Sequence, residues 1–188
     1  MKISSIFTML LAAGILVSCG SNKPENTSDT MPDWYLAPPP DTEEFFYAAA
    51  EAQSSRQGTA LRSAQGNATQ AMAAKLEVKV SALQKSFEEE VQSGANANYA
   101  ATFSNASEQL VNSTLNGVSR DRAECEQLDP EMTGGNVNSR CYVLVRMPVG
   151  QARTVLDNAL SKDEELYTKF KASKAFDELQ NKLHEIEN

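Results

Sequence analysis

Histidine is almost absent from this chain of 188 residues, and several sequence motifs that are common in enzymes are absent as well. The one histidine, His184, lies on a charged segment near the end of the sequence. A serine–histidine–carboxylate site gains no support from it, because the base in such a site needs an orienting partner and a dry pocket. No Gly-rich phosphate loop and no alternating-Asp calcium loop is present. We expect a protein that is not an enzyme and binds no cofactor; a two-carboxylate hydrolase stays open because 25 acidic residues always contain pairs.

Positive charge and long apolar runs are scarce as well. The 17 basic residues are outnumbered by 25 acidic ones, which gives a net charge of −8. Such a balance disfavours nucleic acid as a partner and disfavours adhesion to anionic lipid through a basic face. The apolar stretch 6–17 is shorter than the about 20 residues that cross a bilayer. The three cysteines and single histidine provide no transition-metal cluster of the usual spacing, so we expect no metal site.

The amino terminus instead has the pattern of an export signal. Lys2 supplies a positive charge before the apolar stretch 6–17, as in secretory signals. The stretch ends in Leu16-Val17-Ser18-Cys19-Gly20, which resembles the bacterial lipobox. That resemblance implies cleavage after residue 18, lipidation of Cys19 and attachment to a membrane through the lipid. Gly20, in place of Asp, implies the outer membrane by similarity to enterobacterial sorting. An ordinary signal peptide with a chance cysteine is the alternative.

Residues 19–42 are polar and proline-rich, and we interpret them as a lipidated cysteine followed by a flexible linker. The linker contains a small apolar cluster, Trp34-Tyr35-Leu36, with the only tryptophan of the chain. Two interpretations of Trp34 are open. It packs on the domain and fixes the linker to it, or it is an exposed aromatic that contacts a sugar or a peptide. Residues 43–188 are long enough for one domain and too short for two.

The first half of the domain predicts one strand and two helices. The aromatic and alanine run 45–50 is typical of a buried strand. Ser54, with Gln57 three residues later, predicts the start of a long helix. Apolar residues then recur every three or four positions on one face: Leu61, Ala64, Ala68, Met72, Leu76, Val80, Leu83, Phe87 and Val91. After a break at Gly94 and Asn96, a second helix is predicted by the spacing of Tyr99, Phe103, Ala106, Leu110 and Thr114.

Two strands follow, over 118–128 and 140–147, joined by a loop that contains Gly134-Gly135. Each strand carries one cysteine, and the loop lies midway between Cys125 and Cys141. In a symmetric hairpin the two would be opposite each other at a distance that a disulfide spans. Export to an oxidising compartment favours the bond. The alternative is two free thiols, because a register slip of one residue would place them on opposite faces.

The last quarter predicts two helices. Pro148 suits the first turn of a helix that contains Ala152, Leu156 and Leu160, and Ser161 with Glu164 forms a capping-box pattern. The final helix carries an apolar stripe, which we expect to pack on the core, with self-association as the alternative: Leu166, Phe170, Phe176, Leu179, Leu183 and Ile186.

The predicted order β-α-α-β-β-α-α defines an α+β domain with a small antiparallel sheet of about three strands packed against long helices. Three features together resemble the LPP-twenty lipoprotein family: Pro32-Asp33-Trp34 before Pro38-Pro39, the long alanine-spaced helix, and Tyr142-Val143-Leu144-Val145-Arg146. The first strand departs from that pattern, with alanine in Tyr47-Ala48-Ala49-Ala50 where relatives often carry glycine. The resemblance implies an outer-membrane or surface lipoprotein.

Two functions from different classes remain. The first is a lipid-anchored structural or assembly protein of the envelope that forms a homo-oligomer or docks on an envelope partner. The second is a binding module whose sheet and helices hold a peptide, a glycan or a lipid. An exposed Trp34 or a cleft beside the first strand would favour the second.

Overall fold

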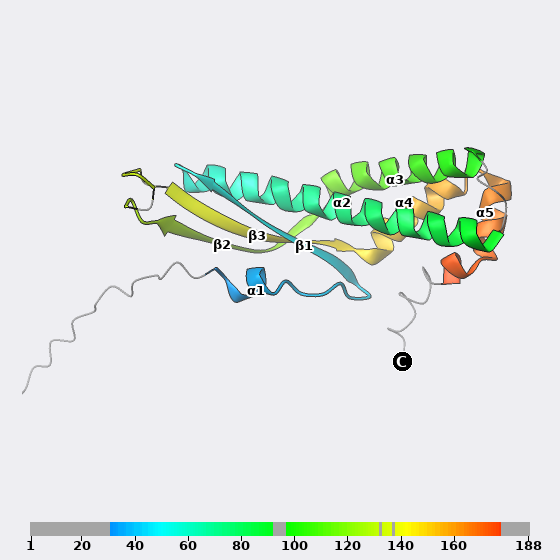
Figure 1. Cartoon of the computed structure of the whole chain (residues 1–188), viewed down its shortest axis with the longest axis horizontal. Helices are drawn as coiled ribbons and strands as arrows, with labels where there is room; N and C mark the ends of the chain where they lie inside the picture. Colours follow the sequence, from blue (N-terminus) through cyan, green and yellow to red (C-terminus); the bar gives the residue numbers. More distant parts are fainter. Residues whose placement is uncertain (1–30, 92–96, 132, 137, 178–188) are drawn as a thin grey trace, which may run out of the picture.

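The computed structural model describes residues 31–91, 97–131, 133–136 and 138–177 (Figure 1). Cys19, His184 and the final apolar residues Leu179, Leu183 and Ile186 lie outside the described residues. The elements are, in chain order, α1 (Asp33–Leu36), β1 (Phe45–Ser54), α2 (Gln57–Val91), α3 (Ala97–Gly117), β2 (Ser119–Leu128), β3 (Asn138–Pro148), α4 (Val149–Leu160) and α5 (Glu164–Lys171).

The three strands form one antiparallel sheet in the order β1-β3-β2. β3 is central and pairs with β1 from Phe45↔Pro148 to Ser54↔Ser139. It pairs with β2 from Leu128↔Asn138 to Ser119↔Arg146, with a bulge between Arg120 and Arg122. β3 has the most continuous buried pattern of the three strands, as its Tyr-Val-Leu-Val segment predicts. The expected α+β fold and sheet are confirmed, with α1 as an additional element.

The long helix α2 packs along one face of the sheet (Figure 1). Its first half faces the sheet with Ala60, Ala64 and Ala68, all fully buried. Alanine has no bulk beyond Cβ, so the helix backbone can lie close to the strands. Its later turns bury larger side chains, among them Met72, Leu76 and Phe87. The predicted stripe is therefore the core face of α2. The 35 residues of α2 span about 52 Å, which makes the molecule long and narrow.

Beyond the sheet, α2 packs against α3, α3 packs against α4, and α4 contacts the following helix α5. The end of this helical part is held by aromatic rings. Phe87 lies 5.8 Å from Phe103 and 5.8 Å from Phe170 between ring centroids, and Phe170 lies 5.6 Å from Phe176. Leu166 and Phe170 are fully buried, so the described part of the final apolar stripe belongs to the core.

Two predicted helix starts differ from the structure. Ser54 is the last residue of β1, because pairing with Ser139 extends that strand, and α2 begins at Gln57. Ser161 ends α4, and the cap of α5 is Asp163, whose carboxylate accepts a hydrogen bond from the Leu166 N–H at 3.0 Å. Ser and Asp are both strong capping residues, so the local sequence does not choose between them. The expected final helix is interrupted, since α5 ends at Lys171 and residues 174–177 are helical again; the part of it after Asp177 lies outside the described residues.

The sheet face opposite α2 is covered by the segment that precedes β1. Tyr142 and Leu144 point to that face, yet Tyr142 is 1% exposed and Leu144 is fully buried. α1 contacts β3 there, and Figure 1 shows α1 and the chain after it running along this side of the sheet. We refer to residues 32–42 as the strap. The described part of the expected linker is thus packed on the domain.

Candidate functional site

The strap is attached to the sheet at its first turn. Pro32 fixes the backbone before α1, and its carbonyl accepts hydrogen bonds from the Tyr35 and Leu36 N–H groups. The Tyr35 ring packs on the Tyr142 ring with 4.7 Å between centroids. The Trp34 indole N–H donates to the Glu124 carboxylate of β2. Both aromatic residues of α1 therefore contact the sheet, while Leu36 is 66% exposed.

A polar cluster lies on the same sheet face, around Arg140. Its guanidinium is 3.6 Å from Glu126 Oε1 and 3.9 Å from Glu51 Oε2. The Gln53 amide, turned so that its oxygen faces the guanidinium, accepts from it at 2.8 and 2.9 Å. The Tyr142 hydroxyl donates to Glu126 at 2.9 Å. These groups bind one another across all three strands, and the cluster supports the aromatic contact of the strap.

Burial raises the pKa of both tyrosines at this contact. For Tyr35, the charge of Glu51 adds to the effect of burial and Arg140 opposes it. For Tyr142, burial is again the largest cause, with Arg140 lowering and Glu126 raising the pKa. Both hydroxyls therefore stay protonated at neutral pH, and Tyr142 remains a hydrogen-bond donor to its carboxylate partner.

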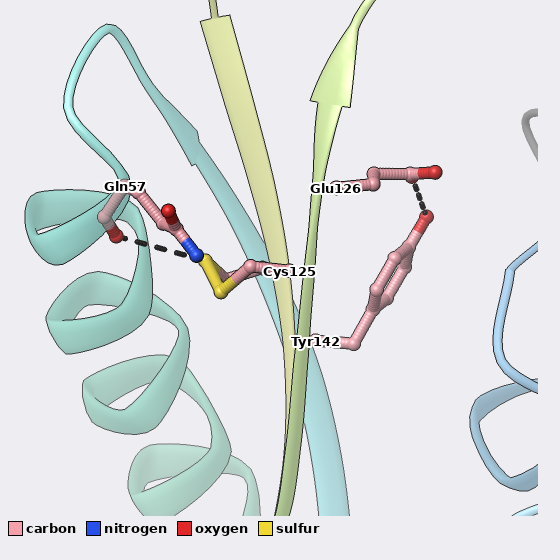
Figure 2. The surroundings of a disulfide bond; sticks show 5 residues. Gln57, Cys125, Glu126 and Tyr142 are labelled. Carbon is pink, nitrogen blue, oxygen red and sulfur yellow. Dashed lines mark hydrogen bonds between the residues drawn. A yellow bond between two sulfur atoms is a disulfide. The ribbon is translucent and has the colours of Figure 1, made fainter. Parts of the chain in front are cut away.

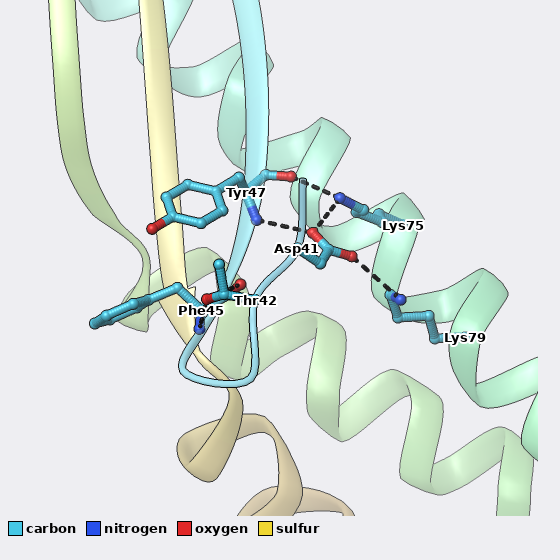
Figure 3. Close-up of polar contacts among 6 residues, drawn as sticks. All are labelled: Asp41, Thr42, Phe45, Tyr47, Lys75 and Lys79. Atoms are coloured by element: carbon cyan, nitrogen blue, oxygen red, sulfur yellow. Dashed lines mark hydrogen bonds and ion pairs between the residues drawn. The ribbon is translucent and has the colours of Figure 1, made fainter. Parts of the chain in front are cut away.

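The other end of the strap is held by Asp41 (Figure 3). Its Oδ1 accepts from the Tyr47 N–H at 3.1 Å and from Lys75 Nζ at 2.5 Å, and its Oδ2 lies 3.2 Å from Lys79 Nζ. Lys75 also donates to the Tyr47 carbonyl at 2.8 Å. Burial opposes ionisation of Asp41, but the hydrogen bonds and charges of its partners outweigh it and hold the pKa of this carboxyl below its ordinary value.

These contacts also close one edge of the sheet. β1 is an edge strand, and its outward backbone groups at Phe45, Tyr47 and Glu51 need partners. The Thr42 N–H donates to the Phe45 carbonyl at 2.9 Å, and the Phe45 N–H donates to the Thr42 hydroxyl at 3.0 Å. Further along α2, the Asn67 amide donates to the Glu51 carbonyl at 3.0 Å. The strap and α2 together cover this edge.

The expected disulfide between Cys125 and Cys141 is present, with the two Cα atoms 4.1 Å apart. Figure 2 shows it on the α2 side of the sheet, with Tyr142 and Glu126 on the opposite side. Cys141 Sγ lies 3.6 Å from the carbonyl oxygen of Gln57, a packing contact because oxidised sulfur has no hydrogen to donate. The bond joins β2 to β3 near the loop end of the hairpin, beside the start of α2.

A pocket of about 450 Å³ opens between α2, α3, α4 and the end of the strap. Its volume lies in the usual range of small-molecule sites. Asp41, Glu43, Lys79 and Arg153 bring two charges of each sign to the pocket. The wall is otherwise largely apolar: Phe46, Leu76, Val80, Ala82, Leu83, Leu110, Val149, Ala152 and Leu156. It is a cleft beside the first strand, the feature that would favour a binding module.

Within the described ranges, no group of three or more His, Cys, Asp or Glu side chains is placed to hold a metal ion. No helix among the described residues is long and apolar enough to cross a membrane. The predicted lipidation site Cys19 lies outside those residues, so its role stays a prediction.

The sequence interpretation identified Trp34 but missed its neighbours. Tyr35 and Asp41 also hold the strap, by packing on Tyr142 and by pairing with Lys75. A signal existed in Pro32-Asp33, since proline before and an acidic residue within the first turn favour a helix start. The pocket has no local signal, because its wall comes from four separate segments.

The fold, the amino-terminal strap and the closed sheet edge describe an α+β domain whose amino-terminal segment is docked on its sheet. The LPP20 lipoprotein family matches residues 32–147, from the first residue of the strap to the last-but-one residue of β3. The chain belongs to the LPP20 lipoprotein family, which makes it a membrane-associated lipoprotein of the cell envelope. No curated protein and no solved structure matches the chain significantly.

Proposed function

We propose that this protein is a non-enzymatic structural lipoprotein of the outer membrane, anchored through lipid on Cys19. Its domain is held in a set orientation as part of an envelope assembly. The observation that carries the proposal is the docked strap. A lipoprotein whose domain only captures ligands needs nothing more than a loose tether. Here the chain that arrives from the lipidation signal is bound at Tyr35 and again at Asp41.

The shape of the domain supports the same role. The strap runs along one face of the sheet (Figure 1). The aromatic cluster around Phe87 lies near the carboxyl end of α2. Because the strap is bound at two places, the tether leaves the domain at one defined point beside α1. A rod of about 52 Å attached in this way presents the same surface to a neighbour each time. The titratable groups around Arg140 are bound to one another and support this attachment.

The test compares lipidated proteins extracted from envelopes in mild detergent. Wild-type chain should migrate with a mass well above that of one copy in its micelle. A Trp34→Ala/Tyr35→Ala variant should remain lipidated but migrate as a single copy, because its domain is no longer oriented. Leu36→Ala is the matched control, since this side chain lies on the same turn and is 66% exposed. A wild-type protein of single-copy size, or a strap variant of unchanged size, would contradict the role.

A second candidate is a binding module for an amphipathic molecule, and the pocket favours it. The apolar wall would take a hydrocarbon chain, and Lys79 or Arg153 would face its polar end. The dye ANS should then bind and be displaced by a long-chain fatty acid, and Leu83→Trp should abolish binding by filling the pocket. Val78→Trp, at a position 69% exposed on the same helix, should not. Absence of ANS binding to the wild type would remove this candidate.

A further inference from the structure

The two edges of the sheet differ. The strap and α2 cover the edge of β1, whereas β2 forms the other edge. Tyr47 directs its backbone groups outward to Asp41 and Lys75, so its partner Arg146 on β3 directs its own groups toward β2. The direction of the backbone N–H and C=O groups alternates along a strand. Those of Cys141 therefore point away from β2, and those of its partner Cys125 point away from β3, toward the outer edge of the sheet. The Cα separation of 4.1 Å for this pair agrees, because antiparallel pairs without hydrogen bonds are the closer kind.

The same alternation directs the N–H and C=O groups of Ala123 and Gln127 outward, beside those of Cys125. Across the part of the chain that the structure describes, no hydrogen bond reaches these groups. Ala123 itself is exposed and small, so a second strand could approach it closely. β2 therefore offers a strand-pairing edge that the fold leaves open, in contrast to β1.

The order of charged residues along β2 indicates which kind of strand could pair with this edge. Arg120 and Arg122 precede Ala123, and Glu124 and Glu126 follow it. If a second copy of β2 runs antiparallel with Ala123 opposite Ala123, then Arg122 of each copy lies opposite Glu124 of the other. A shift to either neighbouring two-fold register would place Glu124 opposite Glu124, or Arg122 opposite Arg122. Opposite charges stabilise such cross-strand pairs and like charges destabilise them.

We propose that β2 pairs with β2 of a second copy about a two-fold axis at Ala123, which joins two three-stranded sheets into one of six strands. The axis is perpendicular to the sheet, so it keeps the faces of the two copies on the same sides. Arg122 and Glu124 lie on the strap face, since they pair with Leu144 and Tyr142. Both straps then lie on one face of the joined sheet, and both lipid anchors can enter the same membrane.

The pairing is short, because the bulge at Arg120 and Arg122 ends the regular part of the strand. Bulges and charges usually protect an edge from other strands, and here the charges complement those of a second copy. An interface of this size is weak in solution. Two copies held in one membrane have a much higher effective concentration, which favours the pair without further contacts.

The experiment uses the lipidated mature chain in vesicles and reads the β2–β2 contact through an Ala123→Cys disulfide. Directly opposite residues of this kind have Cα atoms about 5.5 Å apart, within the reach of a disulfide. Mild oxidation should give a dimer linked at position 123, with Cys125–Cys141 intact by peptide mapping. Val78→Cys is the control, because this exposed position on α2 lies away from the edge and should not cross-link.

Charge reversal then tests the register. Arg122→Glu in the Ala123→Cys protein should lower the dimer yield about tenfold, because both cross-strand pairs become repulsive. Glu124→Arg should do the same. A mixture of these two variants should restore the dimer, since every cross-strand pair between unlike copies is again of opposite charge. Loss of the Trp34 contact in Glu124→Arg cannot produce that recovery, because the mixture keeps the same loss.

The proposal is overturned if Ala123→Cys links no better than Val78→Cys, if Arg122→Glu changes nothing, or if the mixture does not recover. The inference deepens the proposed structural role by naming one contact of the assembly. Its readout is independent of that role, which is tested by the size of the extracted protein and by the strap variant. A cross-linked dimer whose extracted size is unchanged in the Trp34→Ala/Tyr35→Ala variant would keep the β2 pairing and remove the role.

Discussion

Tyr35 and Tyr142 are in direct contact, with ring centroids 4.7 Å apart and planes inclined by 54°. One ring belongs to the strap before β1 and the other to the central strand of the sheet. Through this pair the strap is joined to the most buried strand of the domain, β3. The Trp34 contact with Glu124 and the Asp41 contacts with Lys75 and Lys79 extend the attachment to β2 and to α2.

The Asp41 attachment should depend on pH. The pKa of this carboxyl is lower in the folded protein than in the unfolded chain, so ionisation stabilises the fold above the unfolded value of about 4. We expect the difference in unfolding free energy between wild type and Asp41→Asn to be constant from pH 7 to pH 5. It should shrink as the pH falls through the folded pKa below 4. Urea unfolding at several pH values measures it; a difference that is the same at pH 3 and pH 7 would contradict the assignment.

The disulfide should contribute to stability through the unfolded chain. It closes a loop with a sequence separation of 16, for which chain entropy predicts about 3 kcal/mol. Reduction should therefore lower the denaturation midpoint clearly, and a Cys125→Ala/Cys141→Ala variant should show no response to reductant. Mass analysis of the non-reduced mature chain should show two hydrogens missing. Two reactive thiols in that sample would refute the bond.

The aromatic cluster should be the most sensitive part of the helical end. Phe87 is fully buried against Phe103 and Phe170, so Phe87→Ala should cost about 3–5 kcal/mol of unfolding free energy. Val78→Ala on the same helix should change it by less than about 0.5 kcal/mol, because that side chain is 69% exposed. Equal losses in the two variants would mean that α2 does not pack through this face.

Lipidation can be tested independently of the fold. Cys19→Ser should abolish incorporation of a fatty-acid analogue and move the protein from the membrane to the soluble fraction. The thiol is needed because the lipid is attached through a thioether in proteins with this signal. Cys125→Ala/Cys141→Ala should be labelled normally, which separates the lipidation site from the disulfide. Persistent labelling of Cys19→Ser would show that the lipobox resemblance misleads.

Regular elements were predictable from this sequence because their signal is repeated. The stripe from Ala64 to Phe87 recurs at every turn of α2, and the run around Val143 has the length and composition of a buried strand. Cys125 and Cys141 could be paired because a hairpin with its loop midway between them places them opposite each other.

Docking of Trp34 on the domain was one of the two interpretations of the sequence, but the full extent of the strap was not predicted, for physical reasons. A single helical turn such as α1 has no periodicity, and its stability comes from Tyr142 and Glu124, which are distant in sequence. Three successive prolines in the same segment are also typical of disordered chain. The closing of the β1 edge by Asp41 and Lys75 depends on tertiary position alone. The starts of α2 and α5 were misplaced because several neighbouring residues can cap a helix.

The most direct test of the account is amide hydrogen exchange in the strap of the lipidated protein. An isolated helical turn is unstable in water, so the N–H groups of Tyr35, Leu36 and Ala37 are protected only if α1 stays docked. We predict that these amides exchange at least about tenfold more slowly than in an unstructured chain. This protection should be lost in Tyr35→Ala and kept in Leu36→Ala. Exchange of these three amides at unstructured rates in the wild type would contradict the docked strap and, with it, the proposed fixed orientation of the domain.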